Sequence, residues 1–229
     1  MRLRIFLLAV TVAFFSALNL QSLQAQFVGN GPHDNFRDTS MLKPASGSKV
    51  SVIVFEDLRC PACAHAHPIE VAAALKYRCP IVRYDFPLKQ HIWTFDGAIC
   101  ARYLQDKVSP KLADQYRSAV FLSQSSIASR DDLQHFTQRW MEQHGQQMPF
   151  VMDPKGELAA KVKSDYELGL RLHVERTPTI VVVTQNRYQI ICGVGDSCDP
   201  NQLFPVIEAA VEQTKSLPLP ARAPTSIHR

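Results

Sequence analysis

The chain has 229 residues, of which 46% are hydrophobic and 20% charged, and its formal net charge is +4. These values are typical of one large globular domain or two small ones, and disulfide bonds are not needed merely to hold such a core together. The small excess of positive charge gives no indication of a nucleic-acid partner.

The first 25 residues have the pattern of a secretory signal peptide. Arg2 and Arg4 make the start positive, 5–18 is an apolar stretch, and Ala25 is the small residue before the expected cut. The apolar stretch is short for a membrane-spanning helix, which needs about 20 residues, so we expect cleavage rather than a retained anchor. Loss of the two arginines leaves 23 basic and 21 acidic residues, a net charge of +2. After export, disulfides can form and persist.

Residues 49–93 are predicted to form a strand–helix–strand half, preceded by a polar lead-in at 26–48. The expected elements, in chain order, are a short strand near 39–42, a strand at 50–55, a helix at 61–77 and a strand at 81–86. The segment 50–55 is rich in β-branched and aromatic residues, which is typical of a buried central strand. Pro61 suits the first turn of the helix, because its missing N–H would have no partner there.

The middle of the chain, 94–173, contains no convincing strand and is predicted to be a helical insertion. Its expected helices are 94–107, 110–122, 129–144 and 154–173. Ser129 followed by Asp132 is typical of a helix-opening cap. The half at 174–215 is expected to contain a strand at 179–184, a strand at 188–192 and a closing helix at 200–214. The proline-rich segment 216–229 is expected to be a disordered tail.

This order of elements predicts an α/β chain with a thioredoxin-like fold, in which a mixed central sheet carries an inserted helical subdomain. Two cysteines, Cys60 and Cys63, lie where the first central strand meets its helix. Unpaired backbone N–H groups and the helix dipole stabilise an anion at that position, so the pKa of the Cys60 thiol is expected to fall. Cys63 lies one turn later, near enough to form a short disulfide or to resolve a mixed one. The pattern predicts thiol–disulfide exchange.

The dipeptide Thr177-Pro178 opens the strand that follows the insertion. Proline cannot donate to a sheet ladder, so its place at a strand start is informative. We expect a cis Thr177–Pro178 peptide that faces the cysteine pair, the alternative being an ordinary trans proline. The Thr177 backbone is then expected to pair with an extended substrate, next to Pro61 and Ala62.

The segment 55–68, FEDLRCPACAHAHP, resembles the active-site strand and helix of the DsbA-like thiol–disulfide oxidoreductases. Three further segments are similar to that family, namely RYDFPL at 83–88, AICA at 98–101 and RTPT at 176–179. The resemblance covers about residues 49–210 and implies Cys60 as nucleophile, Cys63 as resolving cysteine and Pro178 as the cis-proline.

The resemblance also implies what the protein acts on and where. It implies dithiol–disulfide exchange on exported proteins with cysteine pairs, in the periplasm or after secretion. We expect an oxidant that a membrane redox partner reoxidises. The alternatives are a disulfide reductase or isomerase, and a non-catalytic binding or chaperone module, although such a module would not need both thiols.

Two positions depart from the family pattern. Many members carry a buried acidic residue six positions before the first cysteine, where this chain has Val54. Glu56 points to the same side of the strand and is the candidate for proton transfer in its place, the alternative being a surface carboxylate. Ala62 stands where strongly oxidising relatives have a histidine, so the redox direction stays open.

The remaining cysteines are treated in two pairs. Cys192 and Cys198 are expected to form a structural disulfide, because two glycines between them let the loop close; free thiols or a second redox pair are the alternatives. Cys100 is expected in the core. Its pairing with Cys79 stays open.

We expect neither a metal ion nor another cofactor. Cys63 and His67 share a helix face, but His65 points too far away to complete a zinc site with them. A c-type haem needs a histidine directly after Cys63, and Ala64 stands there.

Overall fold

The computed structural model describes residues 39–193 and 198–215. The expected signal peptide at 1–25 and the expected tail at 216–229 lie outside these residues, as does most of the lead-in. Within the described part of the chain, no helix is both long enough and apolar enough to cross a membrane.

A four-stranded mixed sheet forms the centre of the molecule, with the strand order β2-β1-β3-β4. The strands are β1 (Val50–Glu56), β2 (Ile81–Asp85), β3 (Thr179–Thr184) and β4 (Tyr188–Cys192). Strand β1 runs parallel to β2 and antiparallel to β3, and β3 pairs antiparallel with β4. The central position of β1 explains its continuous run of buried residues.

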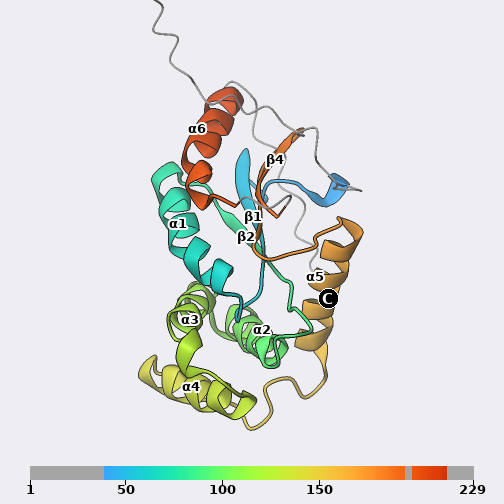
Figure 1. Ribbon diagram of the computed structural model, residues 1–229. Coiled ribbons are helices and arrows are strands. Elements are labelled where there is room, and N and C mark those ends of the chain that lie inside the picture. The colour runs from blue at the N-terminus through green and yellow to red at the C-terminus, as the bar shows by residue number, and fades with distance from the viewer. Residues whose placement is uncertain (1–38, 194–197, 216–229) are drawn as a thin grey trace, which may run out of the picture.

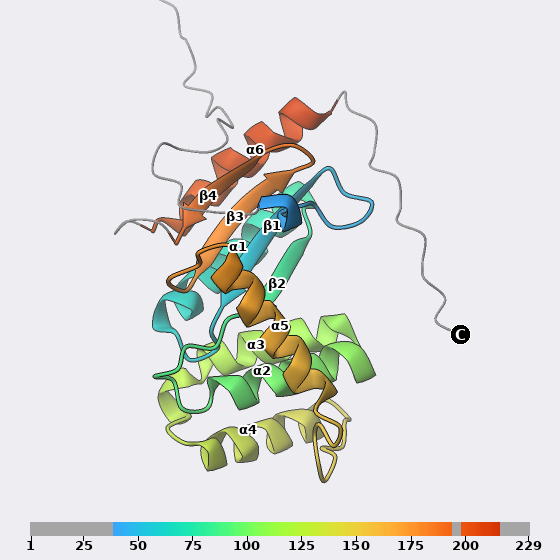
Figure 2. The ribbon, with the colours of Figure 1, turned by 90° about the vertical axis from the view of Figure 1, so that its right-hand side faces the viewer.

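Helices cover both faces of the sheet and one of its ends (Figures 1 and 2). The helices are α1 (Pro61–Tyr77), α2 (Thr94–Tyr103), α3 (Pro110–Leu122), α4 (Arg130–Gln143), α5 (Glu157–Arg171) and α6 (Leu203–Thr214). Helices α1 and α6 lie on one face and α5 on the other, while α2, α3 and α4 are stacked beyond the end of the sheet (Figure 2). Short helical turns are η1 (Thr39–Met41), η2 (Leu104–Val108), η3 (Gln124–Ser126) and η4 (Pro200–Gln202).

Alternating side chains of β1 divide between two apolar layers. Val52 and Val54 pack in the layer formed with α1 and α6. Ile53 and Phe55 pack in the opposite layer, which contains Leu168 and other residues of α5. This period of two is the geometry of a strand with both faces covered.

A third apolar cluster lies within the helical insertion and extends to the end of β1. It includes Leu58, Cys60 and Cys63 together with large side chains of α3 and α4 such as Tyr116 and Trp140. The cysteine motif therefore lies where the core of the insertion meets the sheet.

The structure confirms the thioredoxin-like α/β fold with a mixed sheet and a helical insertion. The short strand expected near 39–42 is wrong. Residues 39–41 form η1, and the Leu42 N–H that follows it donates to the Thr39 carbonyl at 2.9 Å. Leu42 packs into the α5-side layer. β-propensity is realised only beside a partner strand, and no described strand pairs with this segment.

Helix bounds differ most from the expected ones at three places. The helix expected at 94–107 becomes the wider turn η2 after Tyr103, closed by the Ser109 N–H on the Leu104 carbonyl at 2.8 Å. The helix expected at 154–173 begins at Glu157, because Gly156 before it is left-handed with φ 71°. The closing helix begins as η4 and becomes α-helical at residue 203.

The cap expected at Ser129 is present. Its hydroxyl accepts from the Asp132 N–H at 3.1 Å, and the Asp132 carboxylate accepts from the Ser129 N–H at 2.9 Å. This reciprocal capping box satisfies two N–H groups at the start of α4.

Candidate active site

The turn that joins β1 to α1, residues 57–60, places Cys60 at the N-cap of the helix. The Cys60 N–H donates to the Asp57 carbonyl at 3.0 Å, and the Cys60 carbonyl accepts from the Ala64 N–H at 3.1 Å. Cys60 itself is extended, with φ −73° and ψ 119°, and Pro61 opens the helix. We call residues 57–60 the redox turn.

The Cys60 thiol is only 7% exposed, and its Sγ donates to the Thr177 carbonyl at 3.3 Å. A hydrogen bond from the Cys63 thiol is the main cause that lowers the pKa of Cys60 to about 6, and backbone N–H groups of Cys63 and Ala62 add to it against the effect of burial. The thiolate is the nucleophilic form of cysteine. Cys60 is therefore substantially ionised at neutral pH.

Cys63 has the opposite properties. It is 2% exposed, and burial raises the pKa of its thiol well above the ordinary value, with a further contribution from Cys60. The pair thus combines a stabilised thiolate at Cys60 with a protonated thiol at Cys63. A leaving group at Cys63 requires a proton, whereas one at Cys60 does not.

The Thr177–Pro178 peptide is cis and lies against the cysteine pair. The Cys60–Thr177 contact joins segments 117 positions apart in the sequence, because β1 and β3 are neighbours in the sheet. Pro61 and Ala62 are exposed beside Cys60. The structure therefore brings all six residues expected at the catalytic and substrate-binding positions to one place.

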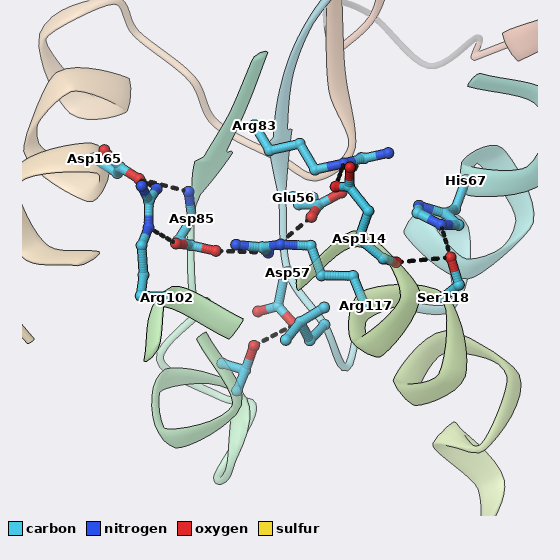
Figure 3. A network of polar contacts seen from close by, with 12 residues as sticks. Glu56, Asp57, His67, Arg83, Asp85, Arg102, Asp114, Arg117, Ser118 and Asp165 are labelled. Atoms are coloured by element: carbon cyan, nitrogen blue, oxygen red, sulfur yellow. Dashed lines mark hydrogen bonds and ion pairs between the residues drawn. The ribbon is translucent and has the colours of Figure 1, made fainter. Parts of the chain in front are cut away.

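Glu56 is buried at the end of β1, so the surface carboxylate considered as an alternative is wrong. Its Oε1 accepts from Arg117 Nη1 at 2.9 Å and its Oε2 accepts from Arg83 Nη1 at 2.7 Å (Figure 3). Arg83 also donates to Glu70 of α1 at 3.0 Å. The charge of Glu56 acts on Cys63, where it adds to the rise in the pKa of that thiol.

The ion pairs continue from Glu56 across the end of the sheet (Figure 3). Arg117 Nη1 lies 2.8 Å from Asp85 Oδ1, and Arg102 Nε donates to Asp85 Oδ2 at 2.7 Å. Arg102 also pairs with Asp165 of α5, whose carboxylate accepts from the Asp85 N–H at 3.0 Å. The network thereby connects α2, α3 and α5 to the ends of β1 and β2.

Asp57 is a buried carboxylate that accepts several hydrogen bonds, and the sequence interpretation missed it. Its carboxylate accepts from the N–H groups of Arg59 and Leu88, each at 2.7 Å, and from the Thr94 hydroxyl at 2.8 Å. His91 Nδ1 lies 3.0 Å from the same carboxylate. An aspartate that accepts from the N–H two residues on is a common turn former, and that local signal could have identified Asp57. The partnership of Arg117 with Glu56 has no local signal.

His67 is buried one turn below Cys63 on α1. Its Nε2 lies 2.7 Å from the Ser118 hydroxyl, which itself donates to the Asp114 carbonyl at 2.9 Å. Because that hydroxyl hydrogen is committed, His67 Nε2 is the donor and its Nδ1 is left as a buried acceptor. Burial lowers the pKa of His67 to about 4, so its ring is neutral at pH 7.

One group of side chains has ligand atoms close enough for a metal ion. Oxygen or nitrogen atoms of Glu56, His67 and Glu70 all lie within 4.8 Å of one another. The guanidinium of Arg83, however, donates to both carboxylates and supplies the positive charge there. These residues fit a guanidinium and would have to release it before they could hold a metal ion.

The other four cysteines lie outside the Cys60–Cys63 motif, although Cys100 belongs to the same apolar cluster as that motif. Cys192 and Cys198 are joined by a disulfide with a Cα–Cα distance of 4.6 Å. Cys79 and Cys100 are unbonded, so the pairing left open by the sequence does not form. They lie in different apolar clusters, one beside α1 and α6 and the other in the insertion. Burial raises their pKa values to about 12 and about 11.

Comparisons with known proteins agree with this arrangement. A family model described as thioredoxin matches residues 38–189. No curated protein sequence matches the chain. Among solved structures, α-DsbA1 of Wolbachia pipientis is 16% identical with a TM-score of 0.57, covering 80% of this chain and 100% of that one.

Two further structures have the same fold. ScsC of Proteus mirabilis is 16% identical with a TM-score of 0.56, covering 74% of this chain and 71% of that one. DsbA2 of Pseudomonas aeruginosa is 15% identical with a TM-score of 0.52, covering 75% and 92%. At such identities the likeness shows a shared fold. Because the family model spans more than half of the sequence, the chain belongs to the thioredoxin family, with the fold that the DsbA structures share.

Proposed function

We propose that the protein is an exported thiol–disulfide oxidoreductase that oxidises cysteine pairs in other exported proteins. The observation that carries the proposal is the unequal pair at the start of α1, where an activated Cys60 faces a cis-proline loop and a buried Cys63. A binding module has no use for such a pair. The proposal includes removal of residues 1–25 on export and the division of the mature chain into 49–93, 94–173 and 174–215.

The proposed reaction begins with the Cys60–Cys63 disulfide. A substrate thiolate attacks Cys60 Sγ, the bond between Cys60 and Cys63 breaks, and its electron pair goes to Cys63, which takes up a proton. The second substrate thiolate then attacks the substrate sulfur of the mixed disulfide. Cys60 leaves as a thiolate, and the substrate holds the new disulfide. A low pKa makes Cys60 a good leaving group in this last step.

We assign Glu56 to proton transfer with Cys63. The support is its burial beneath the motif and the effect of its charge on the Cys63 thiol. We assign the Thr177 backbone, with the exposed Pro61 and Ala62, to binding of an extended substrate segment. A strand-like substrate there would use main-chain hydrogen bonds and leave its cysteine facing Cys60.

The oxidising direction is supported by the stabilised Cys60 thiolate, because stabilising the reduced form makes a disulfide a stronger oxidant. Hydrogen bonds from Cys63 and from backbone N–H groups provide this without a histidine at Ala62. Reoxidation by a membrane partner would complete the cycle. A reductase or isomerase remains the second candidate, favoured by the missing histidine alone.

Oxidation of a reduced peptide with two cysteines tests the proposal. We expect Cys60→Ser and Cys63→Ser each to abolish the activity, because neither variant can form the active-site disulfide, and Cys79→Ser to match the wild type. Unchanged oxidation by the Cys60→Ser protein would refute the assignment. Equilibration with glutathione measures the reduction potential of the Cys60–Cys63 pair and so separates the two directions. A strong oxidant has a potential of about −120 mV, and a reductase one of about −270 mV.

A further inference from the structure

Gln124 lies in η3, between α3 and α4, and contacts the redox turn from the insertion. Its side-chain Nε2 donates to the Leu58 carbonyl at 2.8 Å and to the Cys60 carbonyl at 3.1 Å. A primary amide has two hydrogens on one nitrogen, so one hydrogen goes to each carbonyl. The two bonds join residues more than 60 positions apart in the sequence.

The backbone that carries this amide is itself held firmly. The Ile127 N–H donates to the Gln124 carbonyl at 3.3 Å, and Ile127 is 2% exposed. The Ile127 carbonyl in turn accepts from Trp93 Nε1 at 2.9 Å, and Trp93 is fully buried. Gln124 is therefore fixed to the core of the insertion, and its amide connects that core to the redox turn.

Gln124 contacts the carbonyls of Leu58 and Cys60. These two carbonyls lie on either side of the last two residues of the redox turn, Arg59 and Cys60. The Cys60 carbonyl also accepts from the Ala64 N–H, in the first hydrogen bond of α1. The direction of the Cys60 carbonyl depends on the ψ angle of Cys60. Holding that carbonyl therefore holds Cys60 in the extended conformation from which its Sγ reaches the Thr177 carbonyl. The amide also places the positive end of its dipole against carbonyl oxygens next to the reactive sulfur, which favours a negative charge there.

We propose that Gln124 is a positioning residue, which holds the redox turn from the helical insertion and favours the ionised form of Cys60. The contribution of Gln124 to the reaction rests on the proposed oxidoreductase function, but its effect on Cys60 does not. It touches no reacting atom, since both its donors are used on backbone carbonyls.

Three substitutions separate this role from a merely structural one. Gln124→Met keeps the length of the side chain and removes both donors. Gln124→Glu removes them as well and sets a carboxylate against two carbonyl oxygens. Gln143→Glu is the matched control, since it adds the same charge at an exposed position at the opposite end of α4.

The measurement is the alkylation rate of the reduced protein with iodoacetamide as a function of pH, with thermal unfolding to show that each variant is folded at the assay temperature. Cys79 and Cys100 do not compete, because their pKa values are about 12 and about 11. We expect the midpoint for Cys60 to rise by about one pH unit in Gln124→Glu, a tenfold loss of thiolate below the midpoint. Gln124→Met should shift it in the same direction by less, and Gln143→Glu not at all.

Midpoints of Gln124→Met and Gln124→Glu that coincide with the wild type would overturn the proposal, even if both variants unfold at lower temperature. If Gln124→Glu fails to fold, the midpoint of Gln124→Met decides alone. Peptide oxidation is measured on the same samples. An inactive wild type with shifted variant midpoints would refute the oxidoreductase function and leave the role of Gln124 standing.

Discussion

Replacing Arg117 by methionine tests how much the buried ion pairs contribute to holding α3 against the sheet. Arg117 is 1% exposed, and its Nη1 bonds both Glu56 at 2.9 Å and Asp85 at 2.8 Å. Methionine fills most of the space but leaves two buried carboxylates short of a partner. Removing one partner of a buried pair costs about 3–5 kcal/mol, against a total stability of about 5–15 kcal/mol.

We expect a loss near the lower limit, about 3 kcal/mol in the free energy of unfolding. The reason is that Glu56 keeps its bond to Arg83 and Asp85 keeps its bond to Arg102. The variant should therefore fold.

The loss should depend on pH. Burial alone would raise the pKa of Asp85, but Arg117 and Arg102 outweigh it and hold that pKa below the ordinary value. In the wild type, this carboxylate thus adds stability that is present above its unfolded-state pKa and is lost as the pH falls through the folded-state value. Without Arg117 the folded-state pKa rises and that contribution shrinks. The difference between variant and wild type is therefore largest at neutral pH and narrows towards pH 4.

Urea denaturation followed by circular dichroism at pH 7 and at about pH 4.5 measures both effects. Arg130→Met is the control, because Arg130 pairs with Asp96 at 3.0 Å on the surface, where such pairs contribute at most about 1 kcal/mol. A loss for Arg117→Met no larger than that of the control, or one that is the same at both pH values, would refute the reasoning.

Three other perturbations have defined outcomes. In Gly169→Ala the new Cβ would lie 2.5 Å from the Phe86 ring. The resulting strain of about 1–3 kcal/mol should exceed the gain of about 1 kcal/mol in helix propensity. Urea denaturation should therefore show a lower free energy of unfolding. Replacing Cys192 and Cys198 together by serine opens a loop of sequence separation 6 and should lower stability by about 2 kcal/mol under non-reducing conditions. Burial raises the pKa of Glu70 to about 7, so wild-type stability falls relative to Glu70→Gln as the pH rises from about 4.5 to 7.

Each of these has a contradicting result. A more stable Gly169→Ala protein would show that the Phe86 ring yields without strain. Serine variants at Cys192 and Cys198 with wild-type stability would show that the disulfide does not constrain the unfolded chain. For Glu70, the control is Glu167→Gln at an exposed position of α5, and an equal pH trend in both variants would contradict the raised pKa.

Local patterns were enough for most of the fold and for the centre of the site. A β-branched run, a Cys-x-x-Cys motif at a helix start and a proline at a strand start each act through backbone geometry close to the residues themselves. Positions such as Val52, Cys60 and Pro178 could therefore be placed without knowledge of the tertiary structure. The cap at Ser129 belongs to the same class.

Features that depend on distant neighbours could not be predicted. Glu56 meets Arg117 across 61 positions, and nothing near either residue shows whether its charge is exposed or buried. In the sequence, Gln124 is indistinguishable from an ordinary polar turn residue, because its contact with the redox turn depends on the tertiary structure. The segment near 39–42 has strand-forming residues, but a strand requires an edge on which to pair. Tertiary context decided all three.

The burial of Cys79 and Cys100 in different apolar clusters has a consequence for the chain while it is still unfolded. Once buried in different apolar clusters, neither thiol can reach the other or form a thiolate readily. Before that burial, all six cysteines are accessible, and in the oxidising compartment that we propose they can pair in many ways. On the proposed function, an unfolded copy of the chain would itself be a substrate for folded copies, and burial of Cys79 and Cys100 on folding removes both thiols from incorrect crosslinks.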